Sequence, residues 1–258
     1  VLTLIFALVM CGTASADDYV GGQPLTTVQN GTVSGGVYSD TYYGFDGPGG
    51  TGNNNGGTAD ITYNFQSLPS NAQVTNATLY VAVYCGHMQN NYKVNANVNF
   101  NGNTLENSND IQQPYTFIYD GGNDNTGQGG GTGEPYKIIN NHTIRVTSDY
   151  LMKYDVTSLI QQNNTVRVFT TGSFDGRIKL ISLIAAYNDG DSDQIKYWIN
   201  YGQDVASYQQ EDYFGEVYVG NTNFSTNNIT GDVESANLKV IHMSSNNGYY
   251  GFPSAVND

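Results

Sequence analysis

Apolar and polar residues alternate along much of the chain with a period of two, which is the pattern of a half-buried β-strand. The clearest case is the segment 94–100, where Val94, Ala96, Val98 and Phe100 alternate with asparagines. The same alternation recurs at Ile61, Tyr63 and Phe65, at Leu79, Val81 and Val83, at Ile144 and Val146, and at Val166 and Val168. Each segment is therefore predicted to be a strand with one apolar and one polar face.

A different pattern covers residues 178–187 (IKLISLIAAY), which are almost continuously apolar and predict a central strand buried on both faces. No apolar pattern of helical period extends over a helical length, and only residues 157–162 predict a helical turn. Glycine, asparagine and aspartate dominate residues 44–57, 120–133 and 188–193, which predict turns and long loops. The fold class expected is all-β, an antiparallel β-sandwich of jelly-roll type with long Gly/Asn-rich loops.

The N-terminal segment has the features of a secretory signal. Residues 1–10 are apolar throughout and are followed by Ala14-Ser15-Ala16, which is typical of a cleavage site. Residues 1–16 are therefore predicted to be a signal peptide, truncated at its start. The alternative is that the segment is retained and pairs with the sheet of a neighbouring molecule. Cleavage would leave Cys85 as the single cysteine, which excludes an internal disulfide.

A weak internal repeat suggests how the mature chain is divided. Residues 64–81 and 223–240 share six identical residues in eighteen positions. We expect residues 17–204 to form the β-sandwich domain. Residues 205–258 would be either the start of a second, incomplete β-sandwich repeat or strands that complete the first.

Composition narrows the range of partners. The 258 residues include 31 glycines and 32 asparagines, while charged residues make up 12% and the net charge is −14. An acidic chain lacks the clustered lysine and arginine that nucleic-acid binding and polybasic membrane contact require. No apolar stretch reaches the roughly 20 residues of a transmembrane helix, so no transmembrane span is predicted.

Asparagine also creates six sequons for N-glycosylation, which are plausible surface sites in a secreted protein. The candidate acceptors are Asn30, Asn76, Asn141, Asn163, Asn223 and Asn228.

Acidic residues were considered for metal binding and for catalysis. Asp189, Asp191 and Asp193 alternate in a manner that suits calcium, although a solvated acidic hairpin turn after a buried strand is the favoured explanation. No other cofactor is indicated. A glycosidase needs two opposed carboxylates, for which the candidates are Glu134, Asp155, Asp175, Glu211 and Asp212, but Asp155 is better explained as the cap of the following turn. No catalytic motif is present, and we expect a protein that is not an enzyme, with no catalytic residues.

Tyrosines in or beside polar loops are candidates for carbohydrate contact, because an exposed ring can stack on a sugar while neighbouring amides bind its hydroxyl groups. Tyr42, Tyr43, Tyr115 and Tyr119 are the candidates. The alternative is ordinary strand packing with a solvated hydroxyl group.

Several segments together resemble a known family. They are YVGG at 19–22 with Pro24-Leu25, GGVY at 35–38, ATLYVAVY at 77–84, YDVT at 154–157 with Leu159-Ile160, NTV at 164–166, FDGR at 174–177 and YWINYG at 197–202. Their order resembles a domain-of-unknown-function family found in secreted, often repetitive surface proteins of methanogenic archaea. The YDVTxLI and NTVxV pair is also similar to a piece of jelly-roll carbohydrate-binding domains, where it shapes a turn and the next strand. The resemblance implies location and architecture, and no catalytic residues.

These observations predict a secreted, non-enzymatic, glycosylated surface protein, structural or adhesive, which assembles into a cell-wall, sheath or filament layer through β-sheet contacts. Its expected partners are further copies of itself or other surface proteins, with cell-surface carbohydrate as a possible ligand. The alternatives are a carbohydrate-binding module and, less favoured, a polysaccharide-active enzyme.

Overall fold

The computed structural model describes the larger part of the chain, namely residues 21–43, 58–84, 94–105, 137–139, 143–146, 149–172, 176–205, 229 and 232–242. Twelve strands and one 3-10 turn are found there: β1 (Gly21–Val33), β2 (Gly36–Tyr43), β3 (Thr58–Asn64), β4 (Gln73–Tyr84), β5 (Val94–Phe100), β6 (Asn103–Thr104), β7 (Lys137–Ile139), β8 (Thr143–Val146), β9 (Asp149–Asp155), η2 (Thr157–Leu159), β10 (Thr165–Gly172), β11 (Ile178–Asn188) and β12 (Ile195–Val205).

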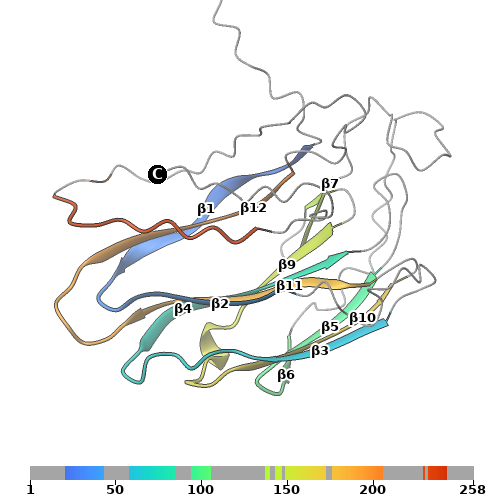
Figure 1. The fold of residues 1–258 in the computed structure, drawn as a ribbon, viewed down its shortest axis with the longest axis horizontal. Helices are drawn as coiled ribbons and strands as arrows, with labels where there is room; N and C mark the ends of the chain where they lie inside the picture. The colour runs from blue at the N-terminus through green and yellow to red at the C-terminus, as the bar shows by residue number, and fades with distance from the viewer. Residues whose placement is uncertain are drawn as a thin grey trace, which may run out of the picture.

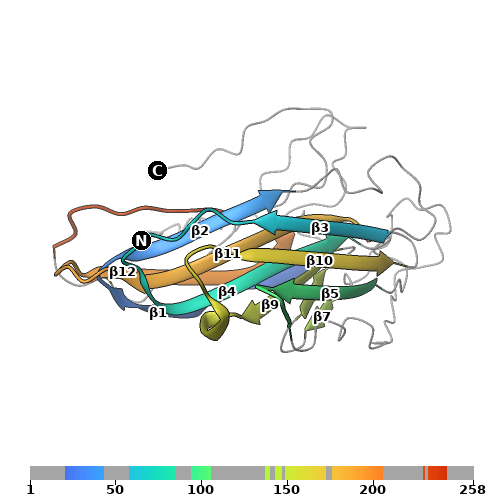
Figure 2. The same cartoon turned by 90° about the horizontal axis from the view of Figure 1, so that it is seen from below.

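The strands form three antiparallel sheets. The large sheet has the order β2-β11-β4-β9-β8-β7, the small sheet has the order β3-β10-β5-β6, and β1 and β12 pair only with each other as a two-stranded ribbon. The small sheet lies on one side of the large sheet and the ribbon lies on the other (Figure 1). Seen from below, β3, β10 and β5 run side by side in front of the large sheet (Figure 2).

The main core fills the space between the small and large sheets. Period-two alternation sends every second residue inward, so Ala96, Val98 and Phe100 of β5 meet Leu79 and Val81 of β4, all fully buried. Burial of this apolar surface is the main force that holds the sandwich together.

A second, smaller core lies on the opposite face of the large sheet, where the ribbon covers it. Tyr201 of β12 packs there against Tyr80, Ala82, Leu151 and Leu180. The ring centroids of Tyr201 and Tyr80 are 5.2 Å apart, and the Tyr201 hydroxyl group donates a hydrogen bond of 3.1 Å to the Leu151 carbonyl. The ribbon is therefore a third layer of the domain rather than an appendage.

β11 contributes to both cores, as do its neighbours β4 and β9, and its continuous apolar sequence predicts this burial on both faces. Its pairing with β4 shifts by one residue between Ile178 and Leu180, so Lys179 is the extra residue of a bulge. Lys179 is buried, and its Nζ atom lies 2.7 Å from Oδ1 of Asp149 on β9 and 4.8 Å from the centre of the Tyr84 ring. Lys179 is the one charged side chain of β11 in the described part of the chain, and its burial is accompanied by an ion pair and a cation–π contact.

The structure confirms an all-β fold of antiparallel sheets packed as a sandwich. Consecutive strands from β2 to β5 alternate between the two sheets, as a jelly roll requires, and the jelly-roll assignment itself stays a prediction. The signal peptide, Cys85 and the loops at 44–57 and 120–133 lie outside the described residues. Residues 232–242 form no strand. Within the described part of the chain, no helix is long and apolar enough to cross a membrane.

Candidate functional site

The outer face of the small sheet is polar and accessible, and we call it the binding face. Its side chains point away from the core, and they are Thr58, Asp60, Thr62 and Asn64 of β3, Thr165, Arg167, Phe169 and Thr171 of β10, Asn95, Asn97 and Asn99 of β5, and Thr104 of β6. Threonine and asparagine supply most of it, and its only charged members are Asp60 and Arg167.

Strand pairing arranges these side chains in rows across the sheet. One row places Arg167 between Thr62 and Asn99, with Thr104 beyond Asn99. The next row places Phe169 between Asp60 and Asn97. Neighbouring strands are about 4.8 Å apart, so members of one row lie close enough to contact the same small ligand.

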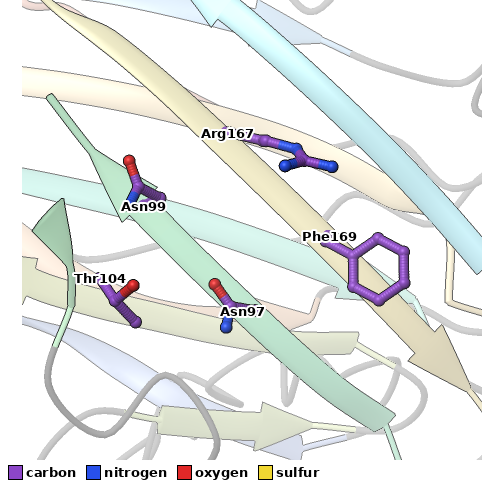
Figure 3. Close-up of a pocket in the computed structure, with 5 residues that line it drawn as sticks. All are labelled: Asn97, Asn99, Thr104, Arg167 and Phe169. Atoms are coloured by element: carbon purple, nitrogen blue, oxygen red, sulfur yellow. The ribbon is translucent and has the colours of Figure 1, made fainter. Parts of the chain in front are cut away.

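A hollow of about 540 Å³ lies on this face and is lined by Asn97, Asn99, Thr104, Arg167 and Phe169. The lining side chains come from three adjacent strands, with Phe169 and Arg167 on β10 and the two asparagines on β5 (Figure 3). The volume falls within the roughly 300–1,000 Å³ of small-molecule sites, although this hollow is open rather than enclosed. Phe169 is 38% exposed, which is unusual for an aromatic side chain without a hydroxyl group.

Arg167 is held in place by Asp60. Its Nε and Nη2 atoms donate hydrogen bonds of 2.8 and 2.6 Å to the two carboxylate oxygens. These hydrogen bonds lower the pKa of the Asp60 carboxyl group and raise the pKa of the Arg167 guanidinium group, so both stay charged over the physiological range. The side chain extends from β10 toward β3 and away from Asn99 (Figure 3).

The end of the binding face is anchored by a network of asparagines. Asn101 and Gly102 have positive φ angles of 50° and 83° and make the tight turn between β5 and β6, as Asn-Gly pairs commonly do. The Asn101 side chain donates to Oδ1 of Asn164 at 2.8 Å and accepts the N–H of Thr165 at 2.8 Å. Asn164 is buried and holds the N–H of Gln161. This network fixes the start of β10 against the turn after β5.

The YDVT segment fixes the preceding turn. Oδ1 of Asp155 accepts the N–H of Thr157 at 2.9 Å, which confirms the predicted capping role. Oγ1 of Thr157 accepts the N–H of Ala77 at 2.9 Å, which ties the turn to β4. The YDVT segment and the Asn101–Asn164 network together therefore set the path by which the chain leaves the large sheet and enters β10.

Neither Tyr42 nor Tyr43, the two candidates for carbohydrate contact that the structure describes, lines this hollow. Tyr42 is half-buried, and its ring centroid lies 5.3 Å from that of Tyr63 against the main core, so Tyr42 packs in the way that the alternative interpretation describes. Tyr43 is 53% exposed at the end of β2. Tyr115 and Tyr119 lie outside the described residues.

Three of the six predicted sequons can be placed. Asn30 is exposed on the outward face of β1, Asn163 is exposed before β10, and Asn76 is half-buried on β4. Oδ1 of Asn163 accepts a hydrogen bond from Ser67 at 2.5 Å. Asn141, Asn223 and Asn228 lie outside the described residues.

The three aspartates considered for calcium serve the turn before β12. Oδ1 of Asp189 accepts hydrogen bonds from Ser34 and from the N–H of Asp191, and Oδ1 of Asp191 accepts the N–H of Asp193. In the ranges that the structure describes, no three His, Cys, Asp or Glu side chains are grouped to hold a metal ion. The calcium hypothesis therefore gains no geometric support and stays a prediction.

Of the carboxylates considered for glycoside hydrolysis, only Asp155 lies in the described residues, where it caps the turn; Glu134, Asp175, Glu211 and Asp212 lie outside them. Sequence reasoning recognised the asparagine face of β5 but missed Arg167 and Phe169. The signal for them was the outward position of both residues in the alternating segment 165–171, where an apolar Phe169 stands among polar neighbours.

Fold and site together define an antiparallel β-sandwich with an anchored, nearly neutral polar face. A family model described as a protein of unknown function (DUF3344) matches residues 18–258, and the chain therefore belongs to the DUF3344 family. No curated protein and no solved structure matches the chain.

Proposed function

We propose that the protein is a non-enzymatic, adhesive surface protein whose binding face contacts carbohydrate. The observation that carries the proposal is the hollow in which an exposed Phe169 ring lies beside the amides of Asn97 and Asn99. Sugars combine faces of C–H groups with rims of hydroxyl groups, and this arrangement offers a partner for each.

The chemistry of the lining matches a polyhydroxylated ligand. The Phe169 ring presents a flat apolar surface with a negative face, against which the C–H groups of a sugar can stack. Each asparagine amide has two donor hydrogens and an acceptor oxygen, and Thr104 has a hydroxyl group that does both. Such groups bind hydroxyl groups in either direction without requiring a charge on the ligand.

The anchoring of the face supports binding by a preformed surface. The asparagine network at Asn101 and Asn164 and the ion pair at Arg167 hold the strands and one side chain before a ligand arrives. A ligand on such a surface loses less free energy to the ordering of protein groups, since those groups are already ordered.

The location of the protein is part of the same proposal. A secreted protein at the surface of a methanogenic archaeon, glycosylated at sequons such as Asn30 and Asn163, is supported by the apolar segment 1–10 and the cleavage-like Ala14-Ser15-Ala16, and by the family resemblance. The low share of charged residues and the abundant asparagine agree with a surface whose polarity comes mainly from uncharged side chains.

A pull-down with insoluble polysaccharides and a glycan array tests the proposal. We expect Phe169→Ala and Asn97→Ala to weaken retention about tenfold or more, since each removes a central contact. Tyr43→Ala removes another exposed aromatic side chain, one that the sequence offered as a candidate for carbohydrate contact, and it is the matched control. Loss of binding in Tyr43→Ala with full binding in Phe169→Ala would place the site elsewhere, and no retention by the natural protein would reject carbohydrate binding.

A second role, assembly with further copies of the chain, is favoured by a different observation. Of the nine large apolar side chains that are exposed in the described part of the chain, seven belong to the ribbon, to the start of β2 or to segment 229–242: Val28, Val37, Ile195, Ile229, Val233, Leu238 and Val240. Ile241 packs against the second core, which places this segment near the ribbon side of the molecule. Among the described strands, β1 and β12 pair with each other alone, so the outer edges of the ribbon are where another strand would add.

Light scattering over a range of protein concentrations tests assembly. The proposal expects oligomers that Leu238→Lys and Val240→Lys reduce and that Phe169→Ala, on the other side of the sandwich, leaves unchanged. A chain that is monomeric at every concentration would rule this role out.

A further inference from the structure

The Arg167–Asp60 pair bears on which carbohydrates the binding face accepts. Among the described residues of that face, the one cation, Arg167, is engaged at two points by the one anion, Asp60. Arginine binds carboxylate and sulfate groups through the same two-point geometry, using two parallel N–H groups. Asp60 therefore occupies the position that an acidic sugar would need.

We propose that the Arg167–Asp60 pair selects neutral glycans and excludes uronate and sulfated glycans from the binding face. This inference rests on the proposed carbohydrate-binding function and adds a ligand class to it. Asp60 competes with an acidic ligand for the guanidinium group of Arg167. Because Asp60 belongs to the same sheet, its effective concentration at Arg167 is high compared with that of a free ligand.

The geometry leaves Arg167 a role toward neutral sugars. Its pairing with Asp60 uses Nε and Nη2, which leaves Nη1 to donate to a ligand hydroxyl oxygen, and Arg167 is one of the residues that line the hollow. Asp60 sets the orientation of the guanidinium group. Arg167 stands opposite Thr62 on β3, and its ion pair with Asp60, two residues along that strand, directs the side chain toward β3. Arg167 thus supplies a fixed hydrogen-bond donor while its charge is neutralised.

Electrostatics acts in the same direction. Asp60 is ionised because its hydrogen bonds with Arg167 lower the pKa of its carboxyl group. The chain as a whole carries a net charge of −14, which repels polyanions at low ionic strength. Among the described residues of the binding face, the one positive charge is already paired with Asp60, so this part of the face does not favour an acidic polymer.

The test uses the full-length chain and Asp60→Asn, which keeps the size of the side chain and removes its charge. Asp60 is 42% exposed, so the variant is expected to fold, and Asp60→Ser provides a second variant with the same expected effect. Asp193→Asn, in the exposed turn before β12, makes the same change in net charge far from the binding face and is the matched control. The probes are a neutral β-glucan, a neutral mannan, polygalacturonate and a sulfated galactan, immobilised and assayed at two salt concentrations.

The natural protein is expected to bind at least one neutral probe and neither acidic probe. Asp60→Asn is expected to bind the acidic probes about tenfold or more tightly than the natural protein, since the freed Arg167 can then form charge-assisted hydrogen bonds with them. Asp193→Asn is expected to leave the affinity for these probes unchanged. The gain should disappear in the double variant Asp60→Asn/Arg167→Gln.

The outcomes separate the two proposals. If the natural protein binds an acidic probe, or if Asp60→Asn gains no more than Asp193→Asn while neutral binding still depends on Phe169, the selectivity inference is overturned and the carbohydrate-binding function stands. If the natural protein binds no probe and Asp60→Asn gains nothing, both fall. If only Asp60→Asn binds acidic probes, the selector is supported and the neutral-sugar function is not.

Discussion

Removal of the Tyr201 side chain tests whether the β1–β12 ribbon is an integral layer of the domain. Tyr201 is 7% exposed and packs against four residues of the large sheet, and its hydroxyl group donates to the Leu151 carbonyl. Truncation of a large buried aromatic side chain costs about 3–5 kcal/mol of unfolding free energy, because apolar contact is lost and a cavity remains. We expect this cost for Tyr201→Ala.

Tyr201→Phe separates the hydrogen bond from the packing. The ring remains, but the hydrogen bond from the Tyr201 hydroxyl group to the Leu151 carbonyl is lost, which costs about 0.5–1.5 kcal/mol. Phe169→Ala is the control, since its ring is 38% exposed on the opposite side of the sandwich and its loss is expected to cost less than about 1 kcal/mol.

Urea unfolding followed by two signals is the assay. Trp198 is the single tryptophan of the chain and lies on β12, so its fluorescence reports on the ribbon, whereas far-ultraviolet circular dichroism reports on all three sheets. If the ribbon is part of one cooperative unit, the two transitions coincide in the natural protein and move together in Tyr201→Ala. A Trp198 transition at lower urea concentration than the dichroism transition, or a Tyr201→Ala cost below about 1 kcal/mol, would refute the three-layer interpretation.

Three other perturbations give equally direct readouts. Burial raises the pKa of Tyr80 to about 12 from 10.0, so its contribution to stability is complete below pH 10 and is lost as the pH rises through 12, by roughly 3 kcal/mol; Tyr80→Phe should flatten this loss in urea titrations, and an unchanged slope would contradict the assignment. Lys179→Met should cost about 3–5 kcal/mol because it leaves the Asp149 carboxylate without its buried cation, whereas Lys179→Met/Asp149→Leu should recover most of that cost; a double variant as unstable as the sum of the single variants would argue against a coupled pair. Gly35→Ala should cost about 1–3 kcal/mol in thermal melts, since a Cβ there would lie 2.3 Å from the Tyr187 ring, and a melt like that of the natural protein would contradict this packing.

Strands with a strong local pattern were predictable, and strands fixed by distant partners were not. β5 and β11 follow from alternation and from continuous apolarity, both of which are local properties. β1 was not predicted, because its segment contains glycines, a proline and few apolar residues. It forms by pairing with β12 about 170 positions away in the sequence, where Asn30 faces Trp198. No window of a few residues contains that information.

Only part of the binding face was predictable from the sequence, because the neighbours of a strand are not a local property. The asparagines of β5 were recognised as a polar face from their period, but a period does not tell which strand lies beside them. The pairing of β10 with β5 brings Phe169 opposite Asn97 and Arg167 opposite Asn99, and the pairing of β10 with β3 brings Asp60 within reach of Arg167. A position beside a polar loop made the tyrosines candidates for carbohydrate contact, because such a position suggests exposure. Tyr42 lies at the end of a strand instead, where its ring is half-buried against the core.

The polar chemistry of the binding face has a consequence for where the protein can work. Asparagine and threonine neither titrate nor depend strongly on ionic strength, so a face built from them should recognise the same ligand over a wide range of pH and salt. The single ion pair of the face does not break this rule, since the pKa of Asp60 is lowered and that of Arg167 is raised by their mutual hydrogen bonds. A binding face made of lysine and glutamate would instead lose its contacts as salt screened them. The proposed binding of neutral glycans should therefore be unchanged between low and high salt, and a marked salt dependence would contradict this reasoning.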